Sequence, residues 1–347
     1  MTDHATAFAP GRVNLVGEHT DYNDGLALAF AIDQGVTVHA NALPGQRIEA
    51  IASDLGEADE FVLSRPPAGA GWRAFVRGAV AELQRGGVQL DGARLQISGE
   101  VPRGAGLSSS AALEVALCLA LIALTDVPAP PRVELAQICS RVENEWVGAR
   151  TGLLDQLTSL FGERDRAVLI DFRSLAVQPV VLELDGHHLL ILDSGERHSN
   201  AASGYNARRR ECQRACELLG VASLRDVTLE MTARLPEPLA RRARHVVTEN
   251  ERVLAAVQAL ERRDLGELGR LLDASQASLR DDYEVSTPAV EAAVLRLRRA
   301  GALGARVIGG GFGGHVLGLL PAEARAPEGV LEVHPGPGAR VLADSRT

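Results

Sequence analysis

The order of apolar and polar positions along the chain predicts strands near its start. Residues 6–9 predict a short strand, which Pro10 and Gly11 would end in a turn. Residues 26–40 are apolar enough for a buried pair of strands, with Asp33 as the polar exception. Apolar and polar residues alternate over 95–97, which predicts another strand leading into a glycine-rich loop. The start of the chain is thus expected to be rich in strands.

After these strands, apolar residues recur at the spacing of helices. Residues 72–85 place these apolar side chains on one helical face: Phe75, Val76, Ala79, Val80 and Leu83. Residues 111–124 form an apolar run that only Glu114 interrupts, which predicts a buried helix. Pro131 would occupy the first position of the next helix, which carries Glu143 and Glu145.

From Ala167 onward the pattern changes to short strands, which cover 167–171, 177–184 and 188–193. We therefore place a domain boundary near Phe172, with an N-terminal domain of residues 1–172 and a C-terminal domain of residues 173–347. Strands alternate with helices in this second half.

Capping signals mark helices of the second half. Asp264 and Glu267 have the spacing of a capping box. Thr287 and Pro288 begin another helix, which Gly301 ends.

Length and composition narrow the class of protein. At 347 residues and 46% hydrophobic content, the chain is long and apolar enough for about two domains. Its net charge of −9, without a block of basic residues, argues against nucleic acid or an anionic membrane as partner. The four cysteines show no disulfide framework, and the N-terminus lacks the pattern of a secretory signal. We expect a cytoplasmic protein that acts on small solutes.

The chain contains no lysine, so all 36 of its Lys+Arg residues are arginine. A Walker A loop and a protein kinase need a phosphate-binding lysine, and a pyridoxal enzyme needs a Schiff-base lysine. These three classes are therefore excluded.

A polar segment between two apolar stretches is the first candidate site. It contains Arg12, Glu18, His19 and Asp21. Carboxylates accept hydrogen bonds from hydroxyl groups, as in sugar pockets, and an arginine can hold a phosphoryl group. A solvated polar turn that reverses at Asn23–Gly25 would have the same composition. A metal site on His19 and Asp21 would lack distant ligands.

A glycine- and serine-rich loop, residues 102–110, precedes the apolar run and is the second candidate site. Gly104 and Gly106 allow close approach of a ligand to the backbone, and the following helix N-terminus offers unpaired N–H groups to phosphate. A serine N-cap on a buried helix is the alternative. Further on, leucines flank Asp155, which suits a partly desolvated catalytic carboxylate or a plain helix-entry aspartate.

The glycine run 309–314 fits G-x-G-x-x-G, but the strand predicted over 315–320 follows it instead of a helix. We therefore predict a strand–glycine–strand hairpin, with a last strand near 330–334. Asp193, His198 and Ser199 suggest a hydrolase triad, but the chain has no G-x-S-x-G elbow.

Three motifs in a fixed order carry a resemblance to a known family. They are GRVNLVGEHTDYNDG from Gly11, PRGAGLSSSAALEVA from Pro102, and GGGFGGH from Gly309, where His315 stands in place of a common Cys. Together they resemble the galactokinases of the galactokinase, homoserine kinase, mevalonate kinase and phosphomevalonate kinase (GHMP) superfamily. The resemblance runs the whole length, including GLLDQ from Gly152 and GARVL from Gly338. It implies a two-domain α+β fold, with an N-terminal half like ribosomal protein S5 domain 2 and a ferredoxin-like C-terminal half.

The resemblance also implies roles for individual residues. Asp155 would be the general base on the C1 hydroxyl, and Arg12 would stabilise charge on the transferring phosphoryl group. The residues implied to bind the sugar are Glu18, His19, Thr20, Asp21, Gly152 and Tyr205, the last just before an arginine-rich helix. The residues implied to bind ATP are Ser53, Trp72, Gly104, Ala105, Gly106, Leu107, Ser108, Ser109 and Ser110. Ser110 and Glu143 would bind Mg²⁺.

The implied activity is MgATP-dependent phosphorylation of D-galactose at its C1 hydroxyl by a monomeric enzyme. Phosphoryl transfer depends mainly on positioning and charge stabilisation, so a backbone cradle, a metal and one arginine replace the missing lysine. Two alternatives stay open. One is a kinase of a related sugar such as N-acetylgalactosamine or arabinose. The other is a galactose- and ATP-binding sensor without catalysis, although relatives of that kind lose part of the run that is intact here from Ser108 to Ala112.

Overall fold

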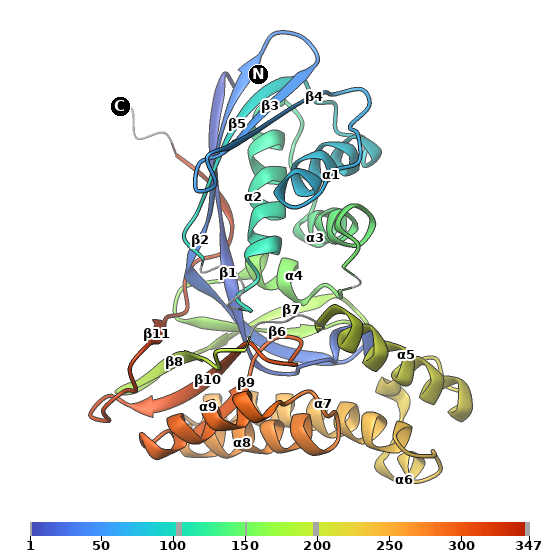
Figure 1. Ribbon diagram of the computed structural model, residues 1–347, viewed down its shortest axis with the longest axis vertical. Coiled ribbons are helices and arrows are strands. Elements are labelled where there is room, and N and C mark those ends of the chain that lie inside the picture. The colour runs from blue at the N-terminus through green and yellow to red at the C-terminus, as the bar shows by residue number, and fades with distance from the viewer. Residues whose placement is uncertain (1, 102–105, 150, 197–200, 344–347) are drawn as a thin grey trace.

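The computed structural model describes residues 2–101, 106–149, 151–196 and 201–343. Within these residues, the larger sheet has eight strands in the order β12-β1-β2-β5-β3-β4, with β6 paired to β2 and β7 to β6 (Figure 1). Its strands are β1 (His4–Val16), β2 (Leu26–Leu43), β3 (Arg47–Ala52), β4 (Glu57–Val62), β5 (Gly92–Gly99), β6 (Arg166–Asp171), β7 (Ala176–Val181) and β12 (Arg340–Leu342). The β3–β5 pair is parallel, and the other pairs are antiparallel.

Helices cover one face of this sheet in the upper part of Figure 1. They are α1 (Trp72–Arg85), α2 (Ser109–Ala123), α3 (Arg132–Arg141), the π-helical segment η2 (Val142–Val147) and α4 (Leu154–Phe161), and the short 3₁₀ turn η1 (Asp21–Asn23) lies between β1 and β2. The predicted faces of α1 and α2 point into one core, where Val76 and Leu117 are fully buried. This core fixes the start of α2 against β1.

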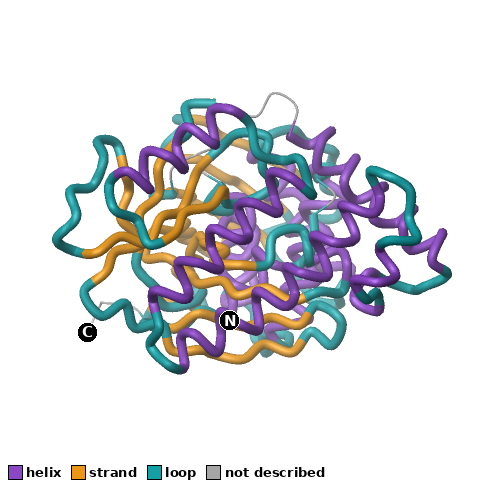
Figure 2. Tube along the Cα trace, turned by 90° about the horizontal axis from the view of Figure 1, so that it is seen from below, coloured by secondary structure: helices purple, strands orange, loops and turns teal. Residues whose placement is uncertain are grey.

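A smaller sheet and a second group of helices form the lower part of the molecule. Its strands run in the order β11 (Val330–Val333), β8 (His187–Asp193), β10 (His315–Pro321) and β9 (Gly304–Val307), all antiparallel. Its helices are α5 (Ala201–Leu219), the 3₁₀ turn η3 (Leu224–Asp226), α6 (Leu229–Thr232), α7 (Leu239–Glu261), α8 (Leu265–Asp281) and α9 (Pro288–Arg299). In Figure 2, from below, helices cross in front of strands.

A middle core joins the two parts. It combines Leu15 of β1 and Leu28 of β2 with Leu268 of α8 and Leu317 of β10, all of them fully buried. The predicted division at residue 172 falls between β6 and β7, which pair with each other, and β12 returns to pair with β1. The division stays a prediction. Among the described residues, no helix has the length and apolarity needed to cross a membrane.

The structure corrects the prediction that Pro10 and Gly11 turn the chain. β1 continues through them to Val16, and the pairing with β2 shifts in register between Pro10 and Arg12. A Cβ on Gly11 would lie 2.5 Å from the carbonyl oxygen of Leu107, so the glycine permits close approach of the serine-rich loop. Bulges of this kind re-aim side chains beside active sites, and here the bulge precedes Arg12.

The prediction of a strand pair over 26–40 is also wrong, because β2 is one continuous strand. Asp33 is exposed and does not break the strand. Gly35 pairs with Pro10, and a Cβ there would lie 2.3 Å from the carbonyl oxygen of Ala9. The glycine therefore serves close packing of two strands and not a turn.

Helix boundaries agree in part with the prediction. Pro131 is the N-cap of α3 and not its first residue, and Glu143 and Glu145 lie beyond α3 in η2. Asp264 accepts a hydrogen bond from the Glu267 amide at 2.8 Å, whereas the Glu267 carboxylate turns to Arg270 instead of completing the box. The predicted Thr287–Pro288 start of α9 is confirmed.

Candidate active site

A cavity of about 370 Å³, the first cavity, lies between the two parts of the molecule. Most residues implied to bind the sugar or to act in catalysis line it: Arg12, Glu18, His19, Asp21, Gly152, Asp155 and Tyr205. Gly106 to Ser110 form another wall, and Gly309 to Gly311 a third. The three motifs that are far apart in the sequence therefore meet around one space.

Arg12 and Asp155 form an ion pair at this cavity. The Arg12 Nε donates to the Asp155 Oδ1 at 2.7 Å, and Nη2 lies 2.6 Å from the same oxygen. The Ser108 hydroxyl donates to the Asp155 Oδ2. Burial opposes the charge on Arg12, but Asp155 and Glu18 outweigh it, so the Arg12 pKa is raised. Both oxygens of the candidate base are thus oriented by groups from β1 and the serine-rich loop.

The serine-rich loop is held against β1. The Arg12 amide donates to the Leu107 carbonyl at 3.0 Å, and its Nη1 donates to the Gly106 carbonyl at 2.6 Å. Gly106 and Ser108 have φ of +67° and +55°, so the chain turns sharply just before α2 begins at Ser109. The helix N-terminus consequently opens toward the cavity wall, as an anion site requires. Gly104 and Ala105 lie outside the described residues.

Glu18 pairs with an arginine that the sequence did not reveal as functional. Arg306 of β9 is fully buried, and its Nη2 lies 3.0 Å from the Glu18 Oε1. The Gly309 amide donates to the same oxygen at 2.8 Å, and Arg306 also donates to the backbone of β1 at Leu15. Burial raises the pKa of Glu18, while Arg306 and Arg12 lower it in part. This cluster attaches the glycine hairpin to the first motif.

Asp21 sits above Gly152. The Gly152 amide donates to the Asp21 Oδ2 at 3.1 Å, and a Cβ on Gly152 would lie 2.2 Å from that oxygen. Only glycine leaves room for the carboxylate here. Burial raises the pKa of Asp21 to about 7, and the nearby carboxylates Asp155 and Glu18 add to the rise.

His19 and Tyr205 form an aromatic wall of the first cavity, with ring centroids 5.1 Å apart. Tyr205 lies within α5 and not before it, as the sequence suggested. The His19 Nε2 donates to the Gly310 carbonyl at 3.2 Å, and the Nδ1 lies 2.8 Å from the Tyr22 hydroxyl. Burial lowers the pKa of His19 to about 3, so the ring is neutral at neutral pH.

Thr20 does not line the cavity. It is fully buried, and its hydroxyl contacts the carbonyl oxygens of Gly17 at 2.8 Å and Leu26 at 2.7 Å. The implied sugar contact of Thr20 stays a prediction that this geometry does not support. The side chain instead ties the loop of the first motif to β2.

Ser110 and Glu143, the implied metal ligands, face each other. The Ser110 hydroxyl donates to the Glu143 Oε1 at 3.0 Å, and Thr151 donates to Oε2 at 2.7 Å. The Gln156 amide bridges Glu143 to the buried Glu114 of α2, at 3.1 Å from an oxygen of each. Burial raises the pKa of Glu143, and it raises that of Glu114 well above the usual value. In the sequence, Glu114 is marked only as the polar break in an apolar run.

A second cavity, of about 570 Å³, shares Ser109 and Ser110 with the first. Its other walls are mostly apolar and include Trp72 and Phe75 of α1. The Trp72 indole donates to Glu57 at 2.9 Å, which fixes the ring. Ser53 does not line this cavity, although its neighbours Ala52 and Asp54 do.

The predicted glycine hairpin is confirmed: β9 and β10 are antiparallel, and the glycines between them line the first cavity. His198 and Ser199 of the suggested triad lie outside the described residues. Asp193 of β8 is the register partner of His315 in β10.

Three family models match segments of this chain. Residues 2–42 match the galactokinase galactose-binding signature, residues 74–163 the GHMP kinases N terminal domain, and residues 256–334 the GHMP kinases C terminal family. The galactokinase of Actinobacillus pleuropneumoniae serotype 3 (strain JL03) is 42% identical over 332 residues, which cover 92% of this chain and 85% of that protein. This chain belongs to the galactokinase family.

Other galactokinases are similarly close. That of Thermotoga petrophila is 41% identical over 316 residues, covering 90% of this chain and 88% of its own length. The Lactococcus lactis galactokinase, whose crystal structure contains galactose, superposes with a TM-score of 0.90 at 31% identity and covers 98% of this chain and 96% of its own. A mevalonate kinase from Methanococcus jannaschii, at 18% identity and a TM-score of 0.69, covers 96% of this chain and 98% of its own and shares the fold. The predicted two-domain GHMP kinase fold is confirmed.

Proposed function

We propose that this galactokinase-family protein transfers the terminal phosphoryl group of ATP to the C1 hydroxyl of D-galactose. The observation that carries the proposal is the meeting of the first motif with the Arg12–Asp155 pair and the serine-rich loop in one cavity. The first cavity takes the sugar, the second takes the nucleoside, and Ser109 and Ser110 between them lie where the phosphates must pass. A crystal structure of a relative with galactose supports the choice of sugar.

Asp155 and Arg12 divide the work at the reacting atoms. The Asp155 carboxylate orients the C1 hydroxyl and accepts its proton as the new bond to phosphorus forms. The Arg12 guanidinium balances the negative charge that spreads over the transferring group. Ser108 and the backbone of the loop fix the carboxylate before the substrates arrive, so little reorganisation accompanies the step.

Ser110 and Glu143 would hold Mg²⁺. The donor set fits this ion, since hydroxyl and carboxylate oxygens face each other and Mg²⁺ is usually bound by one or two carboxylates plus substrate phosphates. The ion would neutralise phosphate charge in the transferring group. Burial of Glu143 raises its pKa because it disfavours the charged carboxylate. A bound cation would offset this by stabilising the charged form. Thr151 and Gln156 both donate to the Glu143 Oε2, which leaves the Oε1 facing Ser110.

Ser110→Ala tests the metal assignment. We expect the KM for MgATP to rise about tenfold to a hundredfold, because the hydroxyl is lost from the ion, while galactose affinity measured by calorimetry stays unchanged. Loss of galactose affinity with intact MgATP affinity would show that the two sites are reversed. Thr125→Ala, just beyond the far end of α2, serves as the control for loss of a part-buried hydroxyl.

Sugar-dependent release of ADP across a panel of sugars tests the proposed function. We expect Mg²⁺-dependent turnover that is greatest with D-galactose. Greater turnover with N-acetylgalactosamine or arabinose would assign a related sugar kinase, and binding of galactose and ATP without turnover would assign a sensor. Gel filtration and cell fractionation test the monomeric state and the cytoplasmic location that we propose with it.

A further inference from the structure

All three tyrosines of the chain lie around the His19 ring. Tyr205 lines the first cavity, whereas Tyr22 and Tyr283 do not. The His19 ring stands among them, with centroids 5.1 Å from Tyr205 and 4.8 Å from Tyr283. Tyr283 is fully buried, 264 positions after His19, and no motif contains it. Its burial beside a neutral histidine suggests a purpose beyond packing.

The polar atoms of this cluster form a chain whose direction is fixed. Because a carbonyl oxygen only accepts, the His19 Nε2 carries the proton that it donates to Gly310. The neutral ring then accepts at Nδ1, so Tyr22 is the donor there. The Tyr22 oxygen in turn accepts from the Tyr283 hydroxyl at 2.9 Å.

The outer end of the chain is the Cys212 thiol of α5, whose sulfur lies 3.0 Å from the Tyr283 hydroxyl. Since the Tyr283 proton points to Tyr22, the thiol donates. Burial raises the pKa of Cys212 to about 12, and it raises those of both tyrosines well above the usual value. Every donor therefore keeps its proton over the working pH range.

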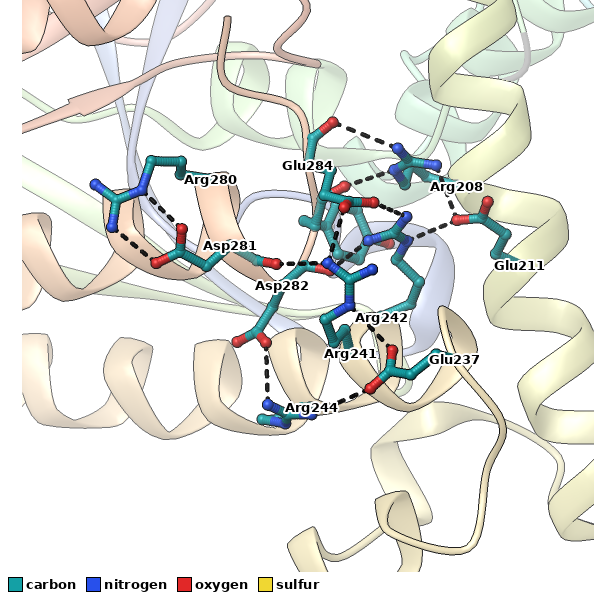
Figure 3. A network of polar contacts seen from close by, with 11 residues as sticks. Arg208, Glu211, Glu237, Arg241, Arg242, Arg244, Arg280, Asp281, Asp282 and Glu284 are labelled. Carbon is teal, nitrogen blue, oxygen red and sulfur yellow. Dashed lines mark hydrogen bonds and ion pairs between the residues drawn. The ribbon is translucent and has the colours of Figure 1, made fainter.

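Arginines bind the backbone segment from Asp281 to Glu284 (Figure 3). Two arginines of α7 bind carbonyl groups at the end of α8. Arg241 donates to the Asp281 carbonyl at 3.1 Å, and Arg242 donates to the Asp282 carbonyl at 2.5 Å. Arg208 of α5 donates to the Tyr283 carbonyl at 2.6 Å. Arg242 is buried and also binds carboxylates on both sides: Glu211 and Glu284. These bonds satisfy the carbonyls that a helix end leaves free and hold Tyr283 rigidly.

The same segment supports the glycine hairpin. The Phe312 amide donates to the Val285 carbonyl at 2.7 Å, and a Cβ on Gly311 would lie 2.6 Å from the Val285 side chain. Residues 281–285 thus contact both groups that bond the His19 ring. Tyr283 contacts Tyr22, which bonds Nδ1, and Val285 contacts the glycine hairpin, whose Gly310 carbonyl bonds Nε2.

We propose that Tyr283 is a positioning residue of the first cavity: through Tyr22 it holds the His19 imidazole in one tautomer and one orientation. This proposal rests on the proposed function, in which the first cavity takes galactose. Tyr283 itself does not line the cavity, so its effect on the sugar passes through His19.

Steady-state kinetics of four variants test the proposal: Tyr283→Phe, Tyr22→Phe, the double variant, and Thr232→Val as a control that removes a buried hydroxyl in α6. We expect Tyr283→Phe to raise the KM for galactose about tenfold, with kcat and the KM for ATP changed by less than about twofold. Because Tyr283 acts through Tyr22, the double variant should match Tyr22→Phe alone, and Thr232→Val should match the wild type. Additive effects of the two tyrosines, an unchanged KM, or equal losses for both substrates would overturn the proposal.

¹⁵N NMR of the His19 ring in the wild-type protein provides a test that needs no turnover. We expect a neutral ring protonated at Nε2, and a weaker hydrogen bond at Nδ1 in Tyr283→Phe. A ring protonated at Nδ1 would reverse every donor and refute the chain, even if a variant failed to fold. Absence of galactose turnover in the wild type, with the expected NMR result, would refute the proposed function and leave the chain intact.

Discussion

The two cavities are built in opposite ways. The first takes its walls from segments scattered between Arg12 and Gly311, and its charged side chains are paired with groups from distant elements. The second lies entirely within residues 36–113 and is mainly apolar. One helix start, at Ser109 and Ser110, belongs to both.

The difference teaches where discrimination resides. A site that hydrogen-bonds a hydroxyl with buried, oriented groups rejects analogues strongly, because an unmatched ligand leaves those groups unpaired. An apolar slot with an aromatic wall discriminates weakly, since it gains mostly from buried area. Variants of the first cavity should therefore have large and selective effects, and variants of the second cavity small ones.

The largest effect is expected for Asp155→Asn. Loss of the base should lower kcat by about 10²- to 10⁴-fold, while the shape and one acceptor remain for galactose binding. The measurement is kcat against pH, with galactose affinity from calorimetry. A kcat near that of the wild type would exclude the base role and leave orientation by the loop and Arg12. Arg12→Lys should also lower kcat, because lysine lacks the parallel N–H donors of the guanidinium. The loss should be smaller than in Arg12→Ala, because lysine keeps the positive charge.

Arg306→Met should come next, because it leaves the buried Glu18 carboxylate without its partner. Removing one member of a buried pair typically costs about 3–5 kcal/mol in free energy of unfolding. Urea unfolding measures the loss. The double variant Glu18→Gln/Arg306→Met should recover much of it, and Arg299→Met at the exposed end of α9 is the control. Equal losses in the single and double variants would contradict the pairing.

A smaller effect is expected for the pH dependence of the KM for galactose. Asp21, with its pKa raised to about 7, is a carboxylate above that pH and a neutral acid below it. If the carboxylate binds galactose, the fraction of competent protein falls as pH decreases, and the KM for galactose should rise about tenfold from pH 8 to pH 6. Asp21→Asn should lose this dependence. A pH-independent KM in the wild type would remove Asp21 from sugar recognition.

The smallest effect should be in the second cavity. Trp72→Ala removes one aromatic wall, which is worth about threefold to tenfold in the KM for ATP. The KM for galactose should not change. A loss above a hundredfold would show that the two cavities discriminate by the same means, against the contrast drawn above.

The sequence was informative where a residue's chemistry is local. The three motifs and the hairpin after β9 could be predicted, because each motif contains its own polar groups or glycines. The strand period also located β5 and β8. Glycine was harder to interpret: Gly11 predicts a turn in the sequence, yet it lies within β1 and permits close contact with the serine-rich loop.

What the sequence could not reveal is which distant group completes each site. Arg306 meets Glu18 across 288 positions, and Gln156 bridges two carboxyl groups from different helices. Neither contact follows from local spacing, because both depend on how elements that are distant in the sequence pack together. The lone Glu114 in an apolar run was a usable signal, since a buried carboxyl needs a partner.

The middle core has a consequence for how the protein melts. Because Leu15 and Leu28 pack directly against Leu268 and Leu317, exposing either part to water also strips apolar cover from the other. The two halves should therefore behave as a single cooperative unit, with calorimetric and van't Hoff enthalpies that agree in one transition. If substrate release requires the two halves to open, the opening would then be a small motion at the edges of this core. It would not be a separation of two independently stable domains.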